Sequence, residues 1–164
     1  MFGIQKIGVT MIILPSAYFG STEYWTAIVK GGEDTVIDLG ENYVKRSERN
    51  RTEIMTSGGV MQLSVQLAHA NRPRQAMRSM RIDYSKRWQH QHLVAMESAY
   101  RNSPYYDYFA DRFTPLFTKE WKWLVDPNMA TLEGVCSVLK IAVPRIAEQY
   151  IVASAGEIDL RDNR

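Results

Sequence analysis

The sequence predicts an α/β fold in which a mixed, partly parallel sheet is opened by a βαβ unit and the helices are concentrated in the C-terminal half. Two apolar, β-branched runs, Thr10–Leu14 and Thr35–Leu39, are typical of buried strands. Between them lies a segment with the apolar spacing of a helix, and from Ser85 onward the pattern is again helical. A crossover helix between neighbouring strands pairs them in parallel with a right-handed connection, so the chain opens as strand, helix, strand.

The boundaries of the βαβ unit can be read from its turn residues. The first strand stops at Pro15-Ser16, and Asp34 and Gly40 bound the second strand. Ser21 or Thr22 can cap the helix between them, because a hydroxyl oxygen accepts a hydrogen bond from a free amide of the first turn. The residues that form its apolar face are Tyr24, Trp25, Ile28 and Val29.

The middle of the chain predicts a polar loop followed by a hairpin. Glu41–Thr52 has no apolar period, and loops of this length inside compact domains are often functional. Ser57-Gly58-Gly59 is a turn signal between Ile54-Met55 and the alternating segment Val60–Leu67. Met80–Tyr84 is expected to form a further short strand. The hairpin residues expected to share one face are Met61, Leu63, Val65 and Leu67.

Three helices are expected in the C-terminal half, at Ser85–Asn102, from Tyr105 to Phe113, and at Met129–Leu139. The charged tail Glu157–Arg164 is expected to be loose. Projection of the first helix as a helical wheel gives two arcs. The packed arc consists of Trp88, His92, Leu93, Ala95, Met96, Ala99 and Tyr100, and the solvent-facing arc of His90, Glu97, Ser98 and Arg101.

The composition indicates one folded domain spanning residues 1–164, because 45% of the residues are hydrophobic and 23% are charged. The single cysteine, Cys136, excludes an internal disulfide and a multi-cysteine metal site, and it favours a reducing compartment. A cytoplasmic location is therefore expected. No segment approaches the roughly 20 apolar residues that cross a bilayer, so any membrane role would be peripheral.

The positive charge is concentrated in the first half of the chain. Residues 1–87 hold 12 Lys or Arg against 8 Asp or Glu, whereas residues 88–164 hold 8 against 10. Six of the cations lie in residues 72–87, where Asp83 is the only acid. This stretch is interpreted first as a solvated basic loop. It would also suit an anionic small molecule such as a nucleotide-sugar or a uronate, and, as a weaker alternative, nucleic acid.

The common catalytic and nucleotide-binding signatures are missing, including GxGxxG, the phosphate-binding P-loop, HExxH and GxSxG. The sequence names no cofactor and no metal ligand set. Ligands of open α/β sheets bind beyond the carboxyl ends of the strands. Two strand ends here lead into polar residues that could line one cleft, namely Ser16 and Tyr18 after the first strand and Asn42, Tyr43 and Lys45 after the second.

Arg49 and Arg51, in the same loop, have guanidinium groups that can hold a carboxylate or phosphate in a bidentate manner. The alternative is that they pair at the surface with neighbouring glutamates. His92 has two readings as well, because a histidine on a packed helical face is either a hydrogen-bonded core residue or the base of a pocket. Glu97 and Arg101 are four residues apart and can form a helix-surface ion pair.

Four stretches of the sequence resemble the WbqC-like protein family in their order along the chain. They are Ile12-Ile13-Leu14-Pro15-Ser16-Ala17-Tyr18-Phe19-Gly20, Glu41-Asn42-Tyr43-Val44-Lys45 with Glu48-Arg49-Asn50-Arg51, Ile82-Asp83-Tyr84, and Glu97-Ser98-Ala99-Tyr100-Arg101-Asn102-Ser103-Pro104-Tyr105. The resemblance spans about residues 11–141, which makes residues 1–10 an N-terminal extension. It also implies that the family pattern continues past this chain with another aromatic-rich segment, so the domain is interpreted as truncated at its C-terminus.

The resemblance implies a role in the assembly of bacterial cell-surface polysaccharides of the O-antigen type, with amide-forming transfer of an amino acid to a sugar acid as one suggested reaction. The positions that match the family pattern are Tyr18, Asn42, Tyr43, Lys45, Asn50, Arg51, His92, Glu97, Tyr100, Arg101 and Asn102. For His92 the resemblance favours the interpretation as a pocket residue over that as a core residue.

Two hypotheses of function follow. The first is a transferase in which Lys45, Arg49 and Arg51 hold an anionic group and His92 is the general base, with Glu97 as a second catalytic candidate. The second is a non-catalytic module or scaffold that binds a sugar or nucleotide-sugar. It is suggested by the missing catalytic signatures and by the aromatic stretch Tyr100–Phe109. The sequence does not define an oligomeric state.

Overall fold

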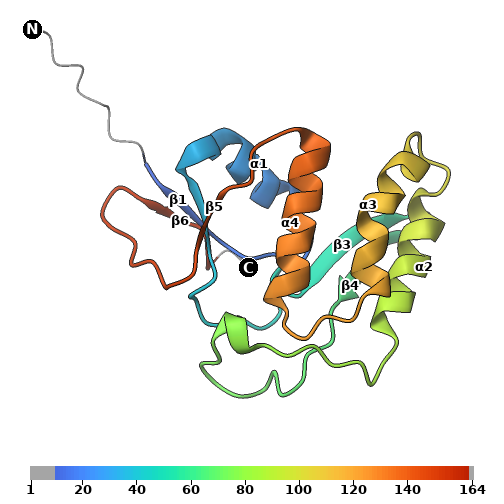
Figure 1. Cartoon of the computed structure of the whole chain (residues 1–164), viewed down its shortest axis with the longest axis horizontal. Coiled ribbons are helices and arrows are strands. Elements are labelled where there is room, and N and C mark those ends of the chain that lie inside the picture. Colours follow the sequence, from blue (N-terminus) through green and yellow to red (C-terminus); the bar gives the residue numbers. More distant parts are fainter. Residues whose placement is uncertain (1–9, 163–164) are drawn as a thin grey trace, which may run out of the picture.

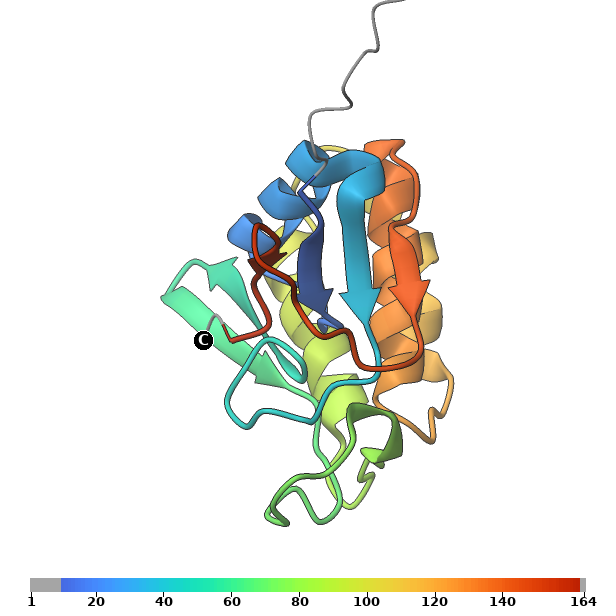
Figure 2. The ribbon, with the colours of Figure 1, turned by 90° about the vertical axis from the view of Figure 1, so that its left-hand side faces the viewer.

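A computed structural model describes residues 10–162, and the expectations for residues 1–9 lie outside this range. A four-stranded parallel sheet forms its centre, with strand order β5-β2-β1-β6 (Figures 1 and 2). Its strands are β1 (Ile12–Pro15), β2 (Thr35–Asp38), β5 (Arg145–Ala147) and β6 (Ile158–Asp159). All three strand pairings are parallel, which confirms the α/β class predicted from the sequence.

The predicted βαβ unit is present. Helix α1 (Thr22–Gly31), followed by the 3-10 turn η1 (Gly32–Asp34), connects β1 to β2. Ser21 is the N-cap, and its hydroxyl accepts a hydrogen bond of 3.2 Å from the Tyr24 amide. Tyr24 and Ile28 of the predicted apolar face are buried and Trp25 is half-buried, but Val29 is 57% exposed, so the prediction was wrong for Val29.

The hairpin is also present, with strands β3 (Arg51–Thr56) and β4 (Gly59–Ser64) paired in antiparallel register. It forms a two-stranded sheet separate from the parallel one. Gly59 has a φ of 110°, which only glycine adopts at little cost, and this accounts for the tight turn. Leu63 and Val65 are buried as expected, whereas Met61 is exposed.

Three helices follow: α2 (Trp88–Tyr100), α3 (Tyr106–Thr118) and α4 (Val125–Leu139). The helix α2 packs against both α3 and β3, and α4 packs against α3 (Figure 1). Helix α4 begins four residues before the predicted Met129, with Pro127 in its first turn, where proline loses no helical hydrogen bond. Within residues 10–162, no helix is both long and apolar enough to cross a membrane.

The expected strand at Met80–Tyr84 is wrong. The short 3-10 helix η2 (Met77–Ser79) precedes it, and the segment makes only single β-bridges, from Ile82 to Leu67 and from Arg81 to Trp123. Met80 and Ile82 are nevertheless buried. The alternation of apolar residues correctly predicted which side chains are buried. It did not predict a strand correctly, because the segment lacks a continuous strand partner among the described residues.

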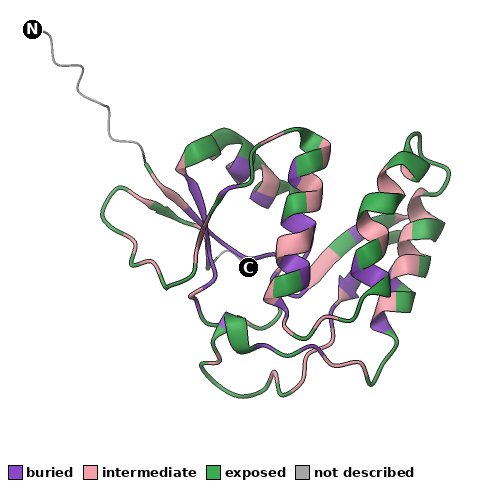
Figure 3. Ribbon diagram, in the orientation of Figure 1, coloured by how far each residue is buried: buried purple, intermediate pink, exposed green. Residues whose placement is uncertain are grey.

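Two apolar clusters hold the layers together. In the first, α1 and α4 cover the same face of the parallel sheet, and Leu132 and Cys136 of α4 join Leu14 and Ile37 (Figure 2). In the second, Trp88 of α2 packs with the segments that follow the strands. The members of the second cluster are Tyr18, Val65, Met77, Met80, Ile82, Trp88 and Leu124. Buried residues accordingly lie along β1 and β2, while the outer faces of α2 and α3 are largely exposed (Figure 3).

The tail at residues 157–162 is not loose, contrary to the sequence-based expectation. Strand β6 pairs with β1, and the Arg161 side chain is buried. Its guanidinium donates to Asp38 and to Asp159, with N–O distances of 2.5 Å in both pairs. The pKa of Asp159 is lowered, chiefly by this hydrogen bond from Arg161. Arg161 and Asp159 of the tail are therefore ion-paired within the fold.

Candidate functional site

A cavity of about 550 Å³ opens where the chain leaves the carboxyl end of β1. We call it the βα cleft. It lies between the first turn of α1, the loop before β3, and the hairpin strands. Its lining residues are Gly20, Ser21, Thr22, Glu23, Arg46, Ser47, Glu48, Arg51, Thr52, Glu53, Ile54, Met55, Val60, Gln62 and Tyr100. This is the place where open α/β sheets bind ligands.

The wall formed by residues 19–21 is shaped by backbone conformation. Phe19 and Gly20 both have left-handed backbones, with φ of 63° and 70°. A Cβ atom on Gly20 would lie 2.6 Å from the Tyr24 ring, so glycine is required there. The turn aims the N-terminus of α1 at the cleft. The Glu48 carboxylate accepts a hydrogen bond of 3.0 Å from the Ser21 amide and fixes the loop against this turn.

Arg49 and Arg51 are two residues apart but have opposite roles. The Arg49 side chain is 1% exposed, and it donates two bonds to the Glu41 carboxylate and one to the Arg161 carbonyl. Burial raises the pKa of Glu41, while the bonds from Arg49 act in the opposite direction. Arg49 therefore pairs with a glutamate, but in the interior and not at the surface.

Arg51, by contrast, lines the βα cleft with most of its hydrogen-bonding capacity free. Its hydrogen bond to the Gln62 side chain is long, at 3.5 Å. Its Nε is buried and has no partner among residues 10–162, so a ligand in the cleft would be bound by the terminal NH groups of the guanidinium. A guanidinium that is half-buried and outside any ion pair can donate hydrogen bonds to a carboxylate or phosphate without first breaking an internal ion pair.

The charge of the cleft is mixed. Arg46 and Arg51 lie with three carboxylates, those of Glu23, Glu48 and Glu53, and with the amide end of α1. The positive end of a helix dipole and the free amides of its first turn favour a negative ligand group. A molecule that presents an anionic group toward Arg51 and hydroxyl or amine groups toward the glutamates fits this arrangement.

His92 is a core residue in this structure. Its ring is 3% exposed, and Nδ1 lies 2.9 Å from the Tyr18 hydroxyl, which is also buried. Trp88 packs edge-on against the ring, with centroids 5.2 Å apart. Burial lowers the pKa of His92 to about 4, against the effect of a hydrogen bond with the Ser64 backbone, and burial raises the pKa of Tyr18. Neither His92 nor Tyr18 lines the βα cleft.

The remaining residues expected at the strand ends lie either in the interior or at the surface outside the βα cleft. Ser16 is fully buried and accepts a hydrogen bond from Asn128. Asn50 is buried and bonded to the Val65 carbonyl and the Tyr43 hydroxyl. Exposed members of the set are Asn42 and Lys45, and the Lys45 amine donates to the Asn71 side chain. None of these residues lines the βα cleft.

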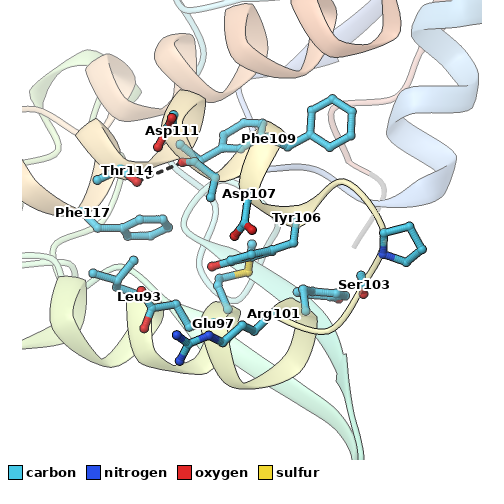
Figure 4. A pocket seen from close by; sticks show the side chains of 15 residues that line it. Leu93, Glu97, Arg101, Ser103, Tyr106, Asp107, Phe109, Asp111, Thr114 and Phe117 are labelled. Atoms are coloured by element: carbon cyan, nitrogen blue, oxygen red, sulfur yellow. Dashed lines mark hydrogen bonds between the residues drawn. The ribbon is translucent and has the colours of Figure 1, made fainter.

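A second cavity, of about 570 Å³, lies between α2 and α3 (Figure 4). We call it the α2–α3 cavity. Three of the predicted site residues, Glu97, Tyr100 and Arg101, line it, whereas Asn102 is exposed outside it. Glu97 and Arg101 do not form the expected ion pair. Tyr100 lines both cavities, and its hydroxyl accepts a hydrogen bond of 3.2 Å from the Met55 amide of β3.

Several lining residues were not identified from the sequence. In the βα cleft they include Arg46, Glu48 and Glu53, and in the α2–α3 cavity Tyr106, Asp107 and Asp111. The rule that ligands bind at the first βα turn gave a usable signal for Glu48, since this acid reaches the helix cap at Ser21. No comparable signal exists for the second cavity, which depends on how two helices pack.

Cys136 is buried in α4 with an apolar environment, and burial raises the pKa of its thiol. This environment disfavours the thiolate that a nucleophile requires. Across the described residues 10–162, no group of three or more His, Cys, Asp or Glu side chains is arranged to hold a metal ion.

The parallel sheet and its βαβ opening define an α/β protein, and the cleft at the first βα turn is its candidate site at the carboxyl end of the sheet. The chain belongs to the WbqC-like protein family, whose model matches residues 16–160.

A curated relative, the uncharacterized protein Rv1507c of Mycobacterium tuberculosis, is 29% identical over 139 residues. The match covers 84% of this chain and 59% of the relative, so the chain spans little more than half of that protein. No solved structure shows a significant match to this chain.

Proposed function

We propose that this protein is an enzyme of bacterial cell-surface polysaccharide biosynthesis that binds a sugar acid or nucleotide-sugar in the βα cleft. The reaction is the transfer of an amino acid to the sugar acid with formation of an amide. The observation that carries the ligand class is the state of Arg51, which lines the cleft and makes only a long hydrogen bond of 3.5 Å, to the Gln62 side chain, within residues 10–162.

The comparison with Arg49 supports this reading of Arg51. A fully paired guanidinium such as Arg49 stabilises the loop and leaves nothing for a ligand. Leaving hydrogen-bonding capacity of a half-buried cation unused costs free energy. A ligand carboxylate or phosphate would recover that free energy, and the amide end of α1 would add to the attraction.

The proposed reaction needs an activated acyl donor. The amine nitrogen of the amino acid attacks the carbonyl carbon of an activated ester of the sugar acid, and a C–N bond forms. The bond to the leaving group breaks, and the leaving group departs with its electron pair. The nitrogen loses one proton to a carboxylate. Glu97, exposed on α2, can take this proton, whereas His92 is buried and bonded to Tyr18.

A non-catalytic sugar-binding module is a second candidate, and one specific observation favours it. Tyr105 and Tyr108 are 76% and 65% exposed, so the stretch Tyr100–Phe109 is not packed into the core. Exposed aromatic rings can stack on sugar rings. The interior position of His92 also removes one candidate general base, which favours a non-catalytic role.

Calorimetric titration with glucuronate and UDP-glucuronate tests the ligand class. We expect binding by the wild-type chain, loss of about tenfold or more in affinity in Arg51→Gln, and no change in the control Arg72→Gln, whose side chain lies in the exposed basic stretch. Equal affinity in Arg51→Gln would contradict the proposal. Mass spectrometry after incubation with an acyl-activated uronate and an amino acid separates the two candidates, since only the enzyme yields the amide.

A further inference from the structure

We infer that the α2–α3 cavity is a second ligand site, which takes a free α-amino acid with a large apolar side chain. This inference deepens the proposed function by assigning the amine substrate, and it rests on that proposal for the reaction but not for the binding. The cavity volume of about 570 Å³ lies in the range of small-molecule sites, roughly 300–1,000 Å³.

One wall of the cavity is apolar and suited to a hydrophobic side chain. Leu93 of α2 and Phe117 of α3 both line it (Figure 4), together with Met96 and Phe113, and Phe117 is buried. Aromatic and thioether side chains adapt well to an apolar guest of variable shape. Burying an apolar side chain there removes its surface from water, which favours binding by about 25 cal/mol per Å².

The mouth of the cavity carries charges of both signs. Glu97, Asp107 and Asp111 supply three carboxylates, and Arg101 supplies one guanidinium. None of these four groups forms an ion pair with another residue in the described part of the chain. The Tyr106 ring lies among them, and its pKa is raised, mainly by burial and next by Glu97.

This combination selects the ligand class. A free ammonium group matches the excess of carboxylates, and a carboxylate on the same small molecule matches Arg101. An apolar side chain then enters the wall formed by α2 and α3. Phosphates and nucleotides are disfavoured, because three carboxylates would repel them. The zwitterion of an α-amino acid has all three features within one small molecule.

The position of the cavity is consistent with a two-substrate reaction. Tyr100 is part of both linings, so the α2–α3 cavity and the βα cleft are neighbours that share this residue. An amine held near Glu97 and an acyl group held near Arg51 would lie on either side of Tyr100. Each site nevertheless has its own charged residues, so each can be tested alone.

The experiment is a calorimetric titration of the full 164-residue chain with L-phenylalanine. The comparison ligands are phenethylamine, which lacks the carboxylate, 3-phenylpropionate, which lacks the ammonium, and glycine, which lacks the apolar side chain. We expect L-phenylalanine to bind, and each comparison ligand to bind about tenfold or more weakly. Absence of binding, or 3-phenylpropionate binding as tightly as L-phenylalanine, would overturn the inference.

Matched variants locate the site. Glu97→Gln and Arg101→Gln replace exposed side chains, so folding should be preserved and can be checked by thermal unfolding. Each should weaken L-phenylalanine binding about tenfold, while Glu133→Gln on α4 and Arg72→Gln should leave it unchanged. Unchanged affinity in both cavity variants would overturn the assignment. Arg51→Gln should retain L-phenylalanine binding, so failure of uronate binding in the βα cleft can be distinguished from failure of this inference.

Discussion

The Tyr18 hydroxyl and Nδ1 of His92, 74 residues apart in the chain, form a buried hydrogen bond of 2.9 Å. It ties the turn after β1 to helix α2. Tyr18 and His92 were both predicted from the sequence to be site residues, and in the structure both join two parts of the core. Burial lowers the pKa of His92 and so keeps the imidazole neutral, which has a consequence for stability.

We expect stability to fall in mildly acidic solution because of His92. The pKa of His92 is about 4 in the folded chain and 6.5 in the unfolded chain, so the unfolded state binds the proton first as the pH falls. The stability that the neutral His92 side chain contributes is complete above about pH 6.5 and is lost between that pH and about pH 4.

Urea unfolding at about pH 7.5 and about pH 5 checks this expectation. The wild-type chain should lose about 2 kcal/mol more than His92→Gln over this interval. The comparison with the variant removes the effect of carboxylates that titrate in the same range. An identical pH dependence in the two proteins would show that His92 is not held neutral by the fold.

Breaking the buried pair of Arg49 and Glu41 should be strongly destabilising. Arg49→Leu leaves the Glu41 carboxylate in the interior without its cation, at a cost of about 3–5 kcal/mol. The double variant with Glu41→Leu should lose less than the sum of the single variants. The exposed pair of Arg78 and Glu148 is the control, and Arg78→Leu should cost under about 1 kcal/mol. Additive losses at the buried pair would contradict the expected coupling.

Gly40 is predicted to be intolerant of any side chain. A Cβ atom there would lie 1.9 Å from the Tyr150 backbone nitrogen, and a backbone atom cannot rotate away. Gly40→Ala should therefore cost more than about 2 kcal/mol in unfolding free energy. Gly58→Ala is the matched control, because its nearest neighbour would be the Thr56 hydroxyl at 3.9 Å. Thermal unfolding of the two variants would reveal the difference, and equal melting temperatures would exclude the close approach.

Loss of the Arg161 side chain should open the C-terminal segment. Arg161→Gln leaves Asp38, which is fully buried, without its cation, and we expect a loss of about 3–5 kcal/mol. Hydrogen exchange should accelerate at residues 158–161, because β6 would detach from β1 before the rest of the sheet unfolds. Arg145→Gln, an exposed substitution on β5, is the control. Unchanged protection of β6 would show that the ion pair does not hold it.

The parts of the fold predicted from the sequence are those with local causes. The runs at Thr10–Leu14 and Thr35–Leu39 are apolar because strands of a covered parallel sheet are buried on both faces. The helical period around Trp88 and His92 correctly placed the packed face of α2. These patterns depend only on neighbours within a few residues, and a single sequence contains that information.

The candidate site was predicted less completely because its residues are distinguished by distant partners. Arg49 and Arg51 look alike in the sequence, yet Arg49 is occupied by Glu41 and by the carbonyl of Arg161, 112 residues away. Tyr18 is buried against His92, whose position 74 residues later in the chain cannot be read from local polarity. The tail was misjudged for the same reason, since its charge is balanced by Asp38, 123 residues earlier.

The pairing of β6 with β1 also sets an order of events during protein synthesis. Strands β1 and β2 emerge early from the ribosome, whereas Ile158–Asp159 and Arg161 follow more than 100 residues later. Until then, β1 is an open sheet edge and Asp38 lacks its cation. Because contacts of such sequence separation form late, the nascent chain must keep this edge from pairing with other chains.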